Sequence, residues 1–416
     1  MVSRAELIVA LLAPGVVVVV LPPGHPVCSS IPAALPMSFL ASTNLVAYHQ
    51  SLLQDRERTG AYRRAVHEVV RPGDVVLDLG AGSGALSLFA CQAGARRVYA
   101  IESGDAIELA REMSRRHGLQ DRIVLVNERS YRARIDEPVD VIVTETFWNF
   151  GFGEGMLGAV LDARRRFLRE EGRIVPAAFE SWLAPADMPQ LYAKLDRWPD
   201  EYELDMSLMR SLVMNNVHQV KVETEALMAE PARFAQMDMC EVEEADVFGE
   251  VEFAASRAGT IHGLVGWFSA TLSPSVRLAT APPNPAPNWG HAFFPLDEPV
   301  RVERGDRLEA SVRSTSNGDV WSWELHLAGE SVSGSRFTNS TLWGFPFSVE
   351  DLHRQSPRFK PTLSQAGEIE RFVLDMLDGT RELSEIEKSA RERFPETFPS
   401  REVAAAYVRR MVARCA

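Results

Sequence analysis

The segment Gly80-Ala81-Gly82-Ser83-Gly84 follows a short apolar run and precedes an apolar helical stretch. Glycines there let the backbone turn tightly and approach a ligand with which Cβ atoms would collide. With Ala85 the segment matches the dinucleotide pattern GxGxxG/A, and it lacks the Gly-Lys-Ser/Thr ending of a P-loop. Asp78 lies two residues before the first glycine, and Glu102 follows the next apolar run, where a carboxylate can accept ribose hydroxyl protons. The pattern predicts a nucleoside-type cofactor site; the alternative is a turn needed for packing alone.

Two carboxylates, Glu145 and Glu154, bracket a loop rich in aromatic residues and glycine. Facing one cavity, two carboxylates raise each other's pKa unless a cation lies between them. A planar guanidinium presents its donors in a fixed fork and is the cation that two carboxylates can hold at once. A hydride-transfer enzyme has no need of such a pair, so the loop favours adenosylmethionine over NAD as the cofactor. The alternative is that both residues are solvated loop acids.

Elements that alternate between strand and helix must position these residues. Stretches such as 105–117 are amphipathic and helical, and a charged helical pattern covers 45–70. Short apolar runs suited to buried parallel strands lie at 74–80, 96–102, 122–127, 139–145 and 172–176. This alternation predicts a doubly wound α/β domain.

The rest of the chain has a different character. Residues 177–335 are mostly strand-like runs separated by Gly, Pro and Asn, which predicts an all-β domain, with a helical interruption at 188–216. From residue 361 onward three short amphipathic helices are expected, the second starting at Ser384 with Glu387 as its capping partner and the third at Ser400. Their expected inward residues are Ile369, Phe372, Val373, Met376, Val403, Ala406, Tyr407 and Met411.

The composition limits the class of protein. The chain has 416 residues, 46% hydrophobic and 24% charged, so it is globular with room for two or three domains. Its net charge of −13 argues against a sequence-independent nucleic-acid binder and favours a cationic substrate or partner. The four cysteines lack disulfide or metal-ligand spacing, so no metal site is predicted and a reducing cytoplasm is expected.

The N-terminal residues stand apart from this organisation. An apolar stretch at 5–21 is similar to the core of a signal peptide, but no small-residue cleavage site follows it. Prolines interrupt any membrane-spanning helix there, so no membrane association is predicted. Because Met37 precedes the first well-patterned segment, we expect residues 1–36 to be a poorly structured extension or the product of a start codon assigned too far upstream. A local strand or an export signal is the alternative.

Several motifs, in the same order, resemble those of the protein arginine N-methyltransferases. The segment 75–103 is similar to the family's first cofactor segment, and 141–157 resembles its double-glutamate loop, with the two acids nine positions apart. The resemblance covers roughly residues 40–335. Further similar segments are Gln54–Thr59 with Tyr62, Tyr202–Ser207, HGLVGWF at 262–268, and Pro287-Asn288-Trp289.

The resemblance implies a class I, Rossmann-like methyltransferase domain followed by a β-barrel-like domain. Arg58 would pair with the methionine carboxylate of S-adenosyl-L-methionine, and Glu102 would bind its ribose. The remaining donor-site residues would be Asp78, Gly80, Gly82, Gly84 and, on the adenine side, Ser130.

The resemblance also implies the acceptor site and the assembly. Glu145 and Glu154 would be the catalytic residues that clamp a substrate guanidinium, with Asn288 and Trp289 as further substrate contacts. Residues 188–216 would be the family's dimerisation arm, which implies a homodimer.

The sequence departs from the family's pattern at several positions. Phe39, Leu40 and Thr43 stand where the family has an N-terminal tyrosine pair, Asn288 replaces a histidine, and Ser130 replaces an acid on the adenine side. These changes could mean a different guanidine substrate, a different product pattern or an inactive relative.

Three aromatic or imidazole side chains have an open role. His291 could replace the lost histidine, although a structural role is expected more often for a lone histidine in a strand. Trp148 and Phe152 could wall the pocket or pack beneath the sheet.

The C-terminal segment weakly resembles the PqqD-like winged-helix domains that hold leader peptides in ribosomal-peptide biosynthesis. Such a domain would bind an extended peptide along the edge of its sheet. The alternatives are a helical cap packed on the barrel and, less in keeping with the acidic charge, a DNA-binding module.

Four regions and one activity are therefore predicted. The expected boundaries are an extension at 1–36, a Rossmann-like domain at 37–176, a β-barrel-like domain at 177–340 and a helical module at 355–416. The expected activity is S-adenosylmethionine-dependent N-methylation of an arginine guanidinium, in a peptide, a protein or the free amino acid. The alternatives are small-molecule N- or O-methylation in secondary metabolism and a catalytically inactive peptide-binding scaffold.

Overall fold

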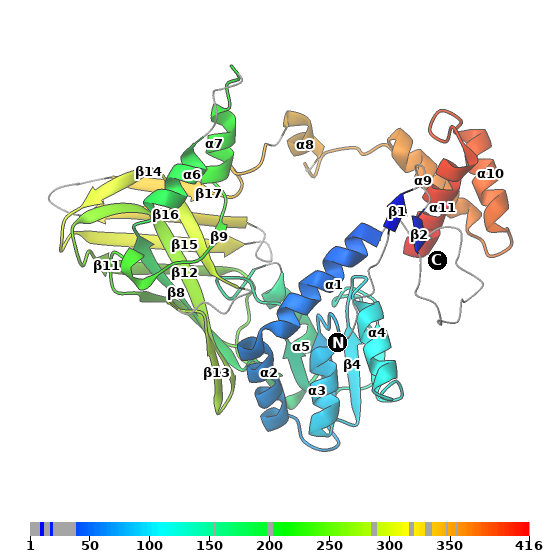
Figure 1. Ribbon diagram of the computed structural model, residues 1–416, viewed down its shortest axis with the longest axis horizontal. Helices are drawn as coiled ribbons and strands as arrows, with labels where there is room; N and C mark the ends of the chain where they lie inside the picture. Colours follow the sequence, from blue (N-terminus) through cyan, green and yellow to red (C-terminus); the bar gives the residue numbers. More distant parts are fainter. Residues whose placement is uncertain are drawn as a thin grey trace. The chain divides into compact units, whose positions relative to one another are not determined.

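The computed structural model divides into two compact units, residues 1–345 and 346–416 (Figure 1). Within the described part of the chain, no helix is both long enough and apolar enough to cross a membrane. In the N-terminal extension, β1 (Val9–Leu11) pairs antiparallel with β2 (Val17–Val19), and the rest of 1–36 lies outside the described residues. The structure describes residues 9–11, 17–19, 39–153, 155–197, 203–283, 289–315, 320–328, 335–346, 348–354 and 356–415.

A five-stranded parallel sheet forms the first half of the large unit, with the order β5-β4-β3-β6-β7. Every residue of the central strand β3 is buried, as expected for a continuous apolar run. The predicted α/β domain is therefore confirmed, and only β7 starts clearly earlier than expected. The strands are β3 (Val75–Leu79), β4 (Arg97–Ile101), β5 (Ile123–Val126), β6 (Val139–Thr144) and β7 (Leu168–Val175).

Helices surround this sheet, and the predicted helical pattern at 45–70 is divided between two helices. Asp55 separates them, because its side chain caps the second helix by accepting a hydrogen bond from the Arg58 amide at 3.1 Å. The cap therefore fixes the position of Arg58 in the first turn of α2. The helices are α1 (Phe39–Gln54), α2 (Arg56–Val69), α3 (Ala85–Ala93), α4 (Ile107–Arg116) and α5 (Met156–Phe167).

Two antiparallel sheets form the second half, with the orders β10-β8-β12-β14-β9 and β11-β15-β16-β17, and β13 paired with β12. Their edges meet where β10 contacts β11 and β14 contacts β17, which gives the barrel-like shape. The predicted all-β domain is confirmed. The strands are β8 (Ala178–Ala186), β9 (His218–Val220), β10 (Ala232–Asp238), β11 (Val247–Ala254), β12 (Gly259–Ser273), β13 (Val276–Ala279), β14 (His291–Val302), β15 (Arg307–Thr315), β16 (Val320–Ala328) and β17 (Arg336–Ser340).

The two halves are joined through α2. This helix packs against α3 on one side and against β12 and β13 on the other. At its end the Glu68 carboxylate accepts hydrogen bonds from the hydroxyls of Ser273 and Ser275, both at 2.6 Å. Arg58 at the start of the same helix is therefore held relative to both the parallel sheet and the barrel.

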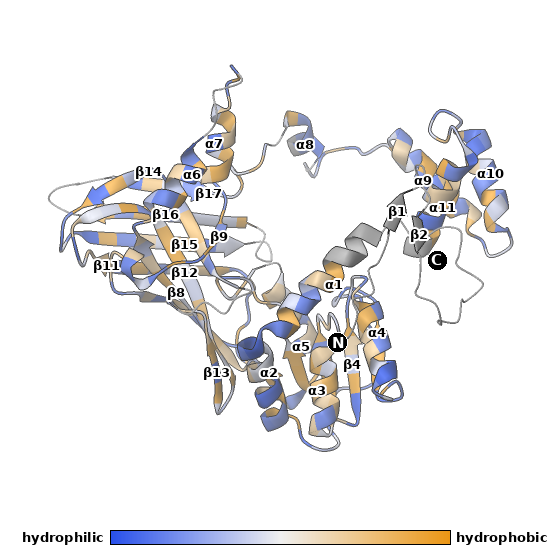
Figure 2. Ribbon diagram, in the orientation of Figure 1, coloured by the Kyte–Doolittle hydropathy of each residue, from blue (hydrophilic) through white to orange (hydrophobic). Residues whose placement is uncertain are grey.

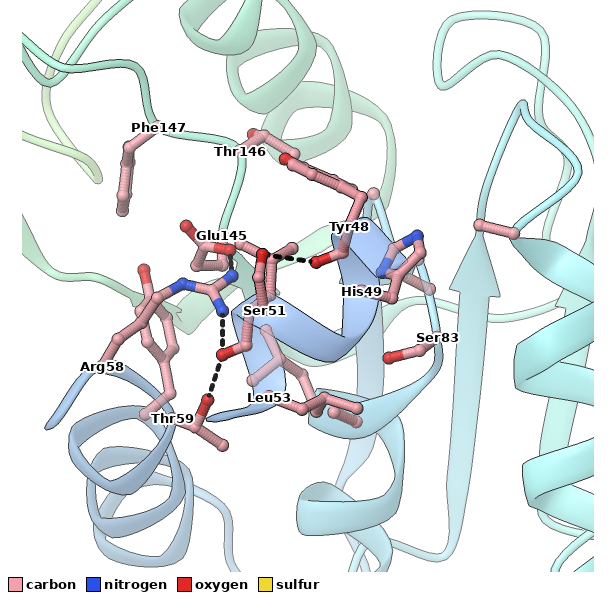
Figure 3. A pocket seen from close by; sticks show the side chains of 18 of the residues that line it. Tyr48, His49, Ser51, Leu53, Arg58, Thr59, Ser83, Glu145, Thr146 and Phe147 are labelled. Atoms are coloured by element: carbon pink, nitrogen blue, oxygen red, sulfur yellow. Dashed lines mark hydrogen bonds and ion pairs between the residues drawn. The ribbon is translucent and has the colours of Figure 1, made fainter. Parts of the chain in front are cut away.

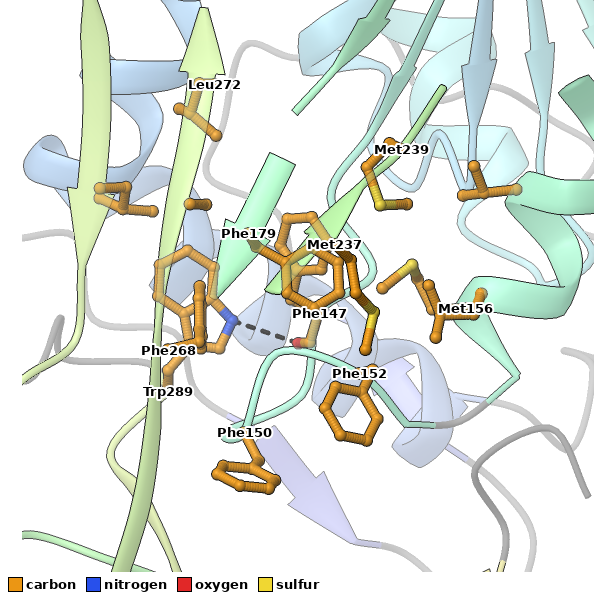
Figure 4. Packing of buried hydrophobic residues seen from close by; sticks show 14 of the residues in the cluster. Phe147, Phe150, Phe152, Met156, Phe179, Met237, Met239, Phe268, Leu272 and Trp289 are labelled. Carbon is orange, nitrogen blue, oxygen red and sulfur yellow. Dashed lines mark hydrogen bonds between the residues drawn. The ribbon is translucent and has the colours of Figure 1, made fainter. Parts of the chain in front are cut away.

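The loop after β6 enters the apolar core of the barrel (Figure 4). Phe150 is fully buried, and its ring centroid lies 5.3 Å from that of Phe234 and 5.5 Å from that of Phe294. Phe152 stacks on Trp321 with centroids 5.3 Å apart. The predicted pocket-wall role therefore does not apply to Phe152. These rings attach the loop that begins at Glu145 to the second half of the unit.

The helical interruption at 188–216 is a projection formed by α6 (Pro189–Asp196) and α7 (Ser207–Met214), with residues 198–202 outside the described ranges. Arg210 joins the two helices through an ion pair with Asp196. The side chains of Leu204 and Leu208 on this projection are 61% and 62% exposed.

The smaller unit contains α8 (Val349–Arg354), α9 (Gln365–Met376), α10 (Leu383–Arg393) and α11 (Arg401–Cys415). In Figure 2, α3 of the large unit is mostly orange and apolar, whereas α10 carries many blue, polar residues. The helix α10 begins one residue before the predicted Ser384, with a capping box between Glu382 and Glu385. The buried core of the unit is Ile369, Val373, Ile386, Ala390, Phe398, Ala404, Val408 and Met411.

The predicted inward face of α11 was partly wrong. Val403 and Ala406 are exposed, whereas Ala404 and Val408 are buried. The apolar residues of this helix fit either of two adjacent faces, and packing against α9 and α10 selects one of them. Among the described residues of this unit there is no strand, so the edge needed for the predicted strand-addition mode is not found there.

Replacing Phe150 by alanine is expected to destabilise the large unit by about 3–5 kcal/mol, because it leaves a cavity among aromatic rings. The measurement is chemical denaturation followed by tryptophan fluorescence, with Phe248→Ala as the control because that ring is 53% exposed. Equal denaturation midpoints for the two variants would contradict the anchoring role.

Candidate functional site

A cavity of about 630 Å³ lies at the carboxyl ends of the parallel strands, between α1, the glycine turn, the loop after β6 and the barrel. Its lining brings together Arg58, Gly80, Gly82, Glu102 and Glu145, five residues that the sequence analysis had singled out. Ligands of open α/β sheets bind at this edge because the strand-to-helix turns meet there.

The glycine turn borders the cavity between β3 and α3. Gly80 and Gly82 have φ values of +76° and +52°, a conformation that other residues adopt at a cost. A Cβ atom on Gly80 would lie 2.5 Å from the Thr146 side chain, so the turn also needs a glycine for space. Gly84 is the N-cap of α3. The turn is therefore shaped by its backbone rather than by side-chain contacts.

Glu102 follows β4 and fixes the turn from the opposite side. Its Oε2 accepts a hydrogen bond from the Gly82 amide at 3.0 Å, and its Oε1 accepts one from the Gly104 amide at 2.7 Å. Each oxygen keeps a lone pair that can accept a hydroxyl proton. The carboxylate is thus oriented by the chain and can still bind a ribose.

His49 and Tyr48 of α1 line the same cavity, and sequence reasoning missed both (Figure 3). A Cβ atom on Gly82 would lie 2.7 Å from the His49 ring, so the imidazole lies directly over the glycine turn. Burial lowers the pKa of His49, and the nearby Glu102 carboxylate opposes this shift. Their place on the helix that ends where the Gln54–Thr59 motif begins was the available signal, but it does not reveal that the helix covers the turn.

Arg58 contacts Glu145 in this structure (Figure 3). Its Nη2 forms an ion pair with Oε2 of Glu145, and its Nη1 donates a hydrogen bond to the Leu52 carbonyl at 3.0 Å. The guanidinium carbon lies 5.6 Å from the ring centroid of Trp289, within cation–π range. Both charged side chains are about nine-tenths buried. A guanidinium therefore already lies against one of the two predicted clamp residues.

Trp289 and Trp148 also line the cavity. The Trp289 indole is buried and donates a hydrogen bond to the Phe147 carbonyl at 3.2 Å, as Figure 4 also shows. Trp148 lies in the loop between Glu145 and the buried Phe150, which holds it in place. A flat cation would thus find aromatic surface beside Glu145.

Two predicted donor-site residues do not line the cavity. Asp78 is fully buried in β3 and accepts a hydrogen bond from the Ser87 hydroxyl at 2.6 Å, so it lies behind the glycine turn. Ser130 is only half-buried, and its carbonyl accepts a hydrogen bond from Arg166. Any effect of Asp78 on a ligand would therefore pass through the turn.

Three further predicted residues have different outcomes. Glu154 and Asn288 lie outside the described residues. His291 is fully buried, where its Nδ1 accepts a hydrogen bond from the Val222 amide and its Nε2 donates one to the Thr280 carbonyl. Both ring nitrogens are used within the barrel, so His291 has the structural role and does not replace the missing histidine.

Comparisons with known proteins agree with this arrangement. Residues 182–326 match the arginine methyltransferase oligomerization subdomain, and residues 59–149 match the ribosomal protein L11 methyltransferase family. Protein arginine N-methyltransferase 6 of Xenopus tropicalis is 34% identical over 283 residues, which are 64% of this chain and 83% of the relative. The chain belongs to the protein arginine N-methyltransferase family.

Other members of this family support the same conclusion. A probable protein arginine N-methyltransferase 6 of Arabidopsis thaliana is 29% identical over 345 residues, 71% of this chain and 79% of the relative. The Trypanosoma brucei PRMT1 enzyme–prozyme heterotetrameric complex with AdoHcy superposes with a TM-score of 0.63 at 26% identity, over 70% of this chain and 96% of that chain. Protein arginine methyltransferase 10 of Arabidopsis thaliana shares the fold, with a TM-score of 0.62 at 24% identity. The match covers 73% of this chain and 100% of that chain.

The cavity fits the methyl donor S-adenosylmethionine on its own geometry. Glycines shape the turn, and the oriented Glu102 carboxylate can accept ribose hydroxyl protons. The Nε of Arg58 is buried and has no hydrogen-bond partner among the described residues, so it can donate to a ligand carboxylate. The sequence predicted each of these groups, whereas the covering His49 came from the structure.

A pH-dependent stability is expected from Asp78. Burial raises the pKa of its carboxyl from 3.8 to about 7, so the folded protein keeps a proton that the unfolded chain loses near pH 4. The stability that this residue contributes is therefore present below about pH 4 and is lost as the pH rises to about 7. Asp78→Asn should remove this loss. Near pH 8, the free energy of unfolding of the variant should exceed that of the native protein by up to about 4 kcal/mol.

The measurement is the melting temperature between pH 5 and pH 8. The control Asp121→Asn also removes one negative charge, but from an exposed side chain. A wild-type profile parallel to that of Asp78→Asn would rule out the buried titration.

Proposed function

We propose that this chain transfers a methyl group from S-adenosylmethionine to the guanidinium of an arginine substrate. The observation that carries the proposal is the contact between Glu145 and a guanidinium at one end of the cavity that the glycine turn borders. Membership of the arginine methyltransferase family supports the same chemistry. The alternative of small-molecule methylation has no comparable structural support.

The donor would be held by the residues around the glycine turn. We propose that Glu102 binds the ribose, that Arg58 binds the methionine carboxylate, and that the turn at Gly80–Gly84 accommodates the nucleoside. His49 would cover the donor from α1, and Asp78 would support the turn from behind. The adenine side lacks an acid at Ser130, so we expect backbone groups to bind the base.

The acceptor guanidinium would be held by Glu145 and Glu154. When bound, the donor supplies a methyl group on a sulfonium that is already electrophilic. The chain has to hold one guanidinium nitrogen in line with it at attack distance. Guanidinium nitrogens are poor nucleophiles because their lone pairs are delocalised and the group stays protonated. Carboxylate contacts from Glu145 and Glu154 would orient one nitrogen, polarise the group and help its proton leave.

The acceptor is proposed to be an arginine in a peptide or protein, or the free amino acid. A peptide substrate is slightly favoured because the small unit weakly resembles domains that hold leader peptides. Leader-peptide binding by this unit stays a prediction. Its described residues form helices around their own apolar core, which is compatible with either a peptide-binding module or a structural one. The predicted cytoplasmic location also stays a prediction.

Glu145→Gln and Glu154→Gln should each lower the rate of methyl transfer to an arginine peptide by about 100-fold or more, since a positioned charge is lost. Binding of AdoHcy, measured by isothermal titration, should be nearly unchanged. Glu241→Gln, an exposed acid outside the cavity, is the control. A near-native rate for either clamp variant would contradict the clamp, and no AdoHcy binding by the native protein would contradict the enzyme assignment.

A homodimer is proposed through the projection formed by α6 and α7. The oligomerization-subdomain match and the exposed Leu204 and Leu208 support it. Leu208→Glu should convert dimers to monomers, because a charge would be buried in an apolar contact. The measurement is light scattering after size exclusion, with Val349→Glu in the small unit as the control because that side chain is 84% exposed. A dimer that persists in Leu208→Glu would assign the contact to another surface.

A further inference from the structure

The turn that follows β17 exposes two neighbouring large apolar side chains. Leu342 and Trp343 are 51% and 55% exposed, although leucine is most often buried and tryptophan is highly buried on average. Both residues lie beyond the segment 182–326 that matches the oligomerization subdomain. Membership of the family therefore gives this surface no role by itself.

Hydrogen bonds order this turn. The Trp343 amide donates to the Ser340 carbonyl at 2.8 Å, and the Gly344 amide donates to the Thr341 carbonyl at 3.1 Å. Binding costs less conformational entropy when the backbone that carries a contact residue is already fixed. The backbone of Leu342 and Trp343 is thus fixed before any partner binds.

The end of α7 holds the same turn in place. The side-chain amide of Asn216 donates a hydrogen bond to the Gly344 carbonyl at 3.0 Å. The side-chain oxygen of the buried Asn215 accepts one from the Ser340 amide at 3.1 Å. A Cβ atom on Gly344 would lie 2.4 Å from the Asn215 carbonyl oxygen, so the two segments are in close contact there. The turn is therefore attached to the projection formed by α6 and α7.

We infer that the turn at 341–344 is a second part of the contact surface for another copy of this chain, and that Trp343 anchors it. The inference rests on the proposed homodimer, and it extends the contact from the projection to a segment outside the family's matched region. It assigns the exposed tryptophan a partner of known chemistry, namely the apolar surface of the second copy.

The spacing of the two apolar sites suits one interface. Leu208 lies in the first turn of α7, and Asn216 follows its last turn. These two residues are eight positions apart, which is about 12 Å at 1.5 Å per residue. A standard interface buries about 800 Å² on each partner, which is a patch roughly 30 Å across. A second copy that covers the exposed Leu208 can therefore also cover the turn.

The composition of the segment also fits a buried contact. Residues 337–345 contain no charged residue, so covering them removes no charge from water. The centres of protein interfaces are depleted in charged residues and enriched in aromatic ones. Tryptophan is among the residues that most often contribute a large share of the binding energy. Trp343 is therefore expected to contribute more to the contact than Leu342.

The test is sedimentation equilibrium of the full chain over a range of concentrations. Trp343→Ser should raise the dimer dissociation constant by about 30-fold, the effect of losing one interface hot spot. Leu342→Ser should raise it by a smaller factor, about 5-fold, because less apolar area is lost. Both side chains are exposed in the single chain, so far-ultraviolet circular dichroism should show unchanged secondary structure.

The matched control is Phe248→Ser, which removes an aromatic side chain of similar exposure, 53%, from β11 of the barrel. Its dissociation constant should equal that of the native protein. Native constants in both Trp343→Ser and Leu342→Ser, with Leu208→Glu monomeric, would overturn the inference and leave the homodimer through the projection intact. A native protein that is monomeric at every concentration would overturn the homodimer, and the inference with it.

Discussion

The ion pair between Arg58 and Glu145 is the interaction on which the arrangement of the site depends. A carboxylate that is nine-tenths buried must be neutralised, and a guanidinium is the cation whose shape suits it. The chain supplies this guanidinium itself, through Arg58. The contact shows that the Glu145 carboxylate can hold a guanidinium at this position.

The geometry of this ion pair is set by both halves of the large unit. Arg58 lies in the first turn of α2, which is capped by Asp55 and is tied to the barrel by Glu68. Glu145 follows β6, and the loop that it begins enters the barrel core at Phe150. A movement of the barrel relative to the sheet would change the distance between the two charges. The barrel thus supports the cavity and also carries the projection formed by α6 and α7.

Much of the site followed from local sequence patterns. Gly80, Gly82 and Glu102 follow successive buried strands, and the ends of parallel strands meet at one edge of a sheet. The covering of the cavity by His49 and Tyr48 did not follow, because it depends on how α1 is placed after the break at Asp55. The predicted inward face of α11 was partly wrong for a similar reason, since neighbouring helices select between two nearly equal apolar faces.

The sequence by itself determined the order of the elements, the family and the residue types at the donor and acceptor ends of the cavity. Strand periodicity and glycine spacing are local properties, because each can be read within one contiguous segment of the sequence. Only the tertiary structure decided that Arg58 contacts Glu145, that Asp78 lies behind the turn and that His291 is structural. These outcomes depend on distances between segments far apart in the chain. Such distances are set by the packing of the whole core rather than by the residues next to each group.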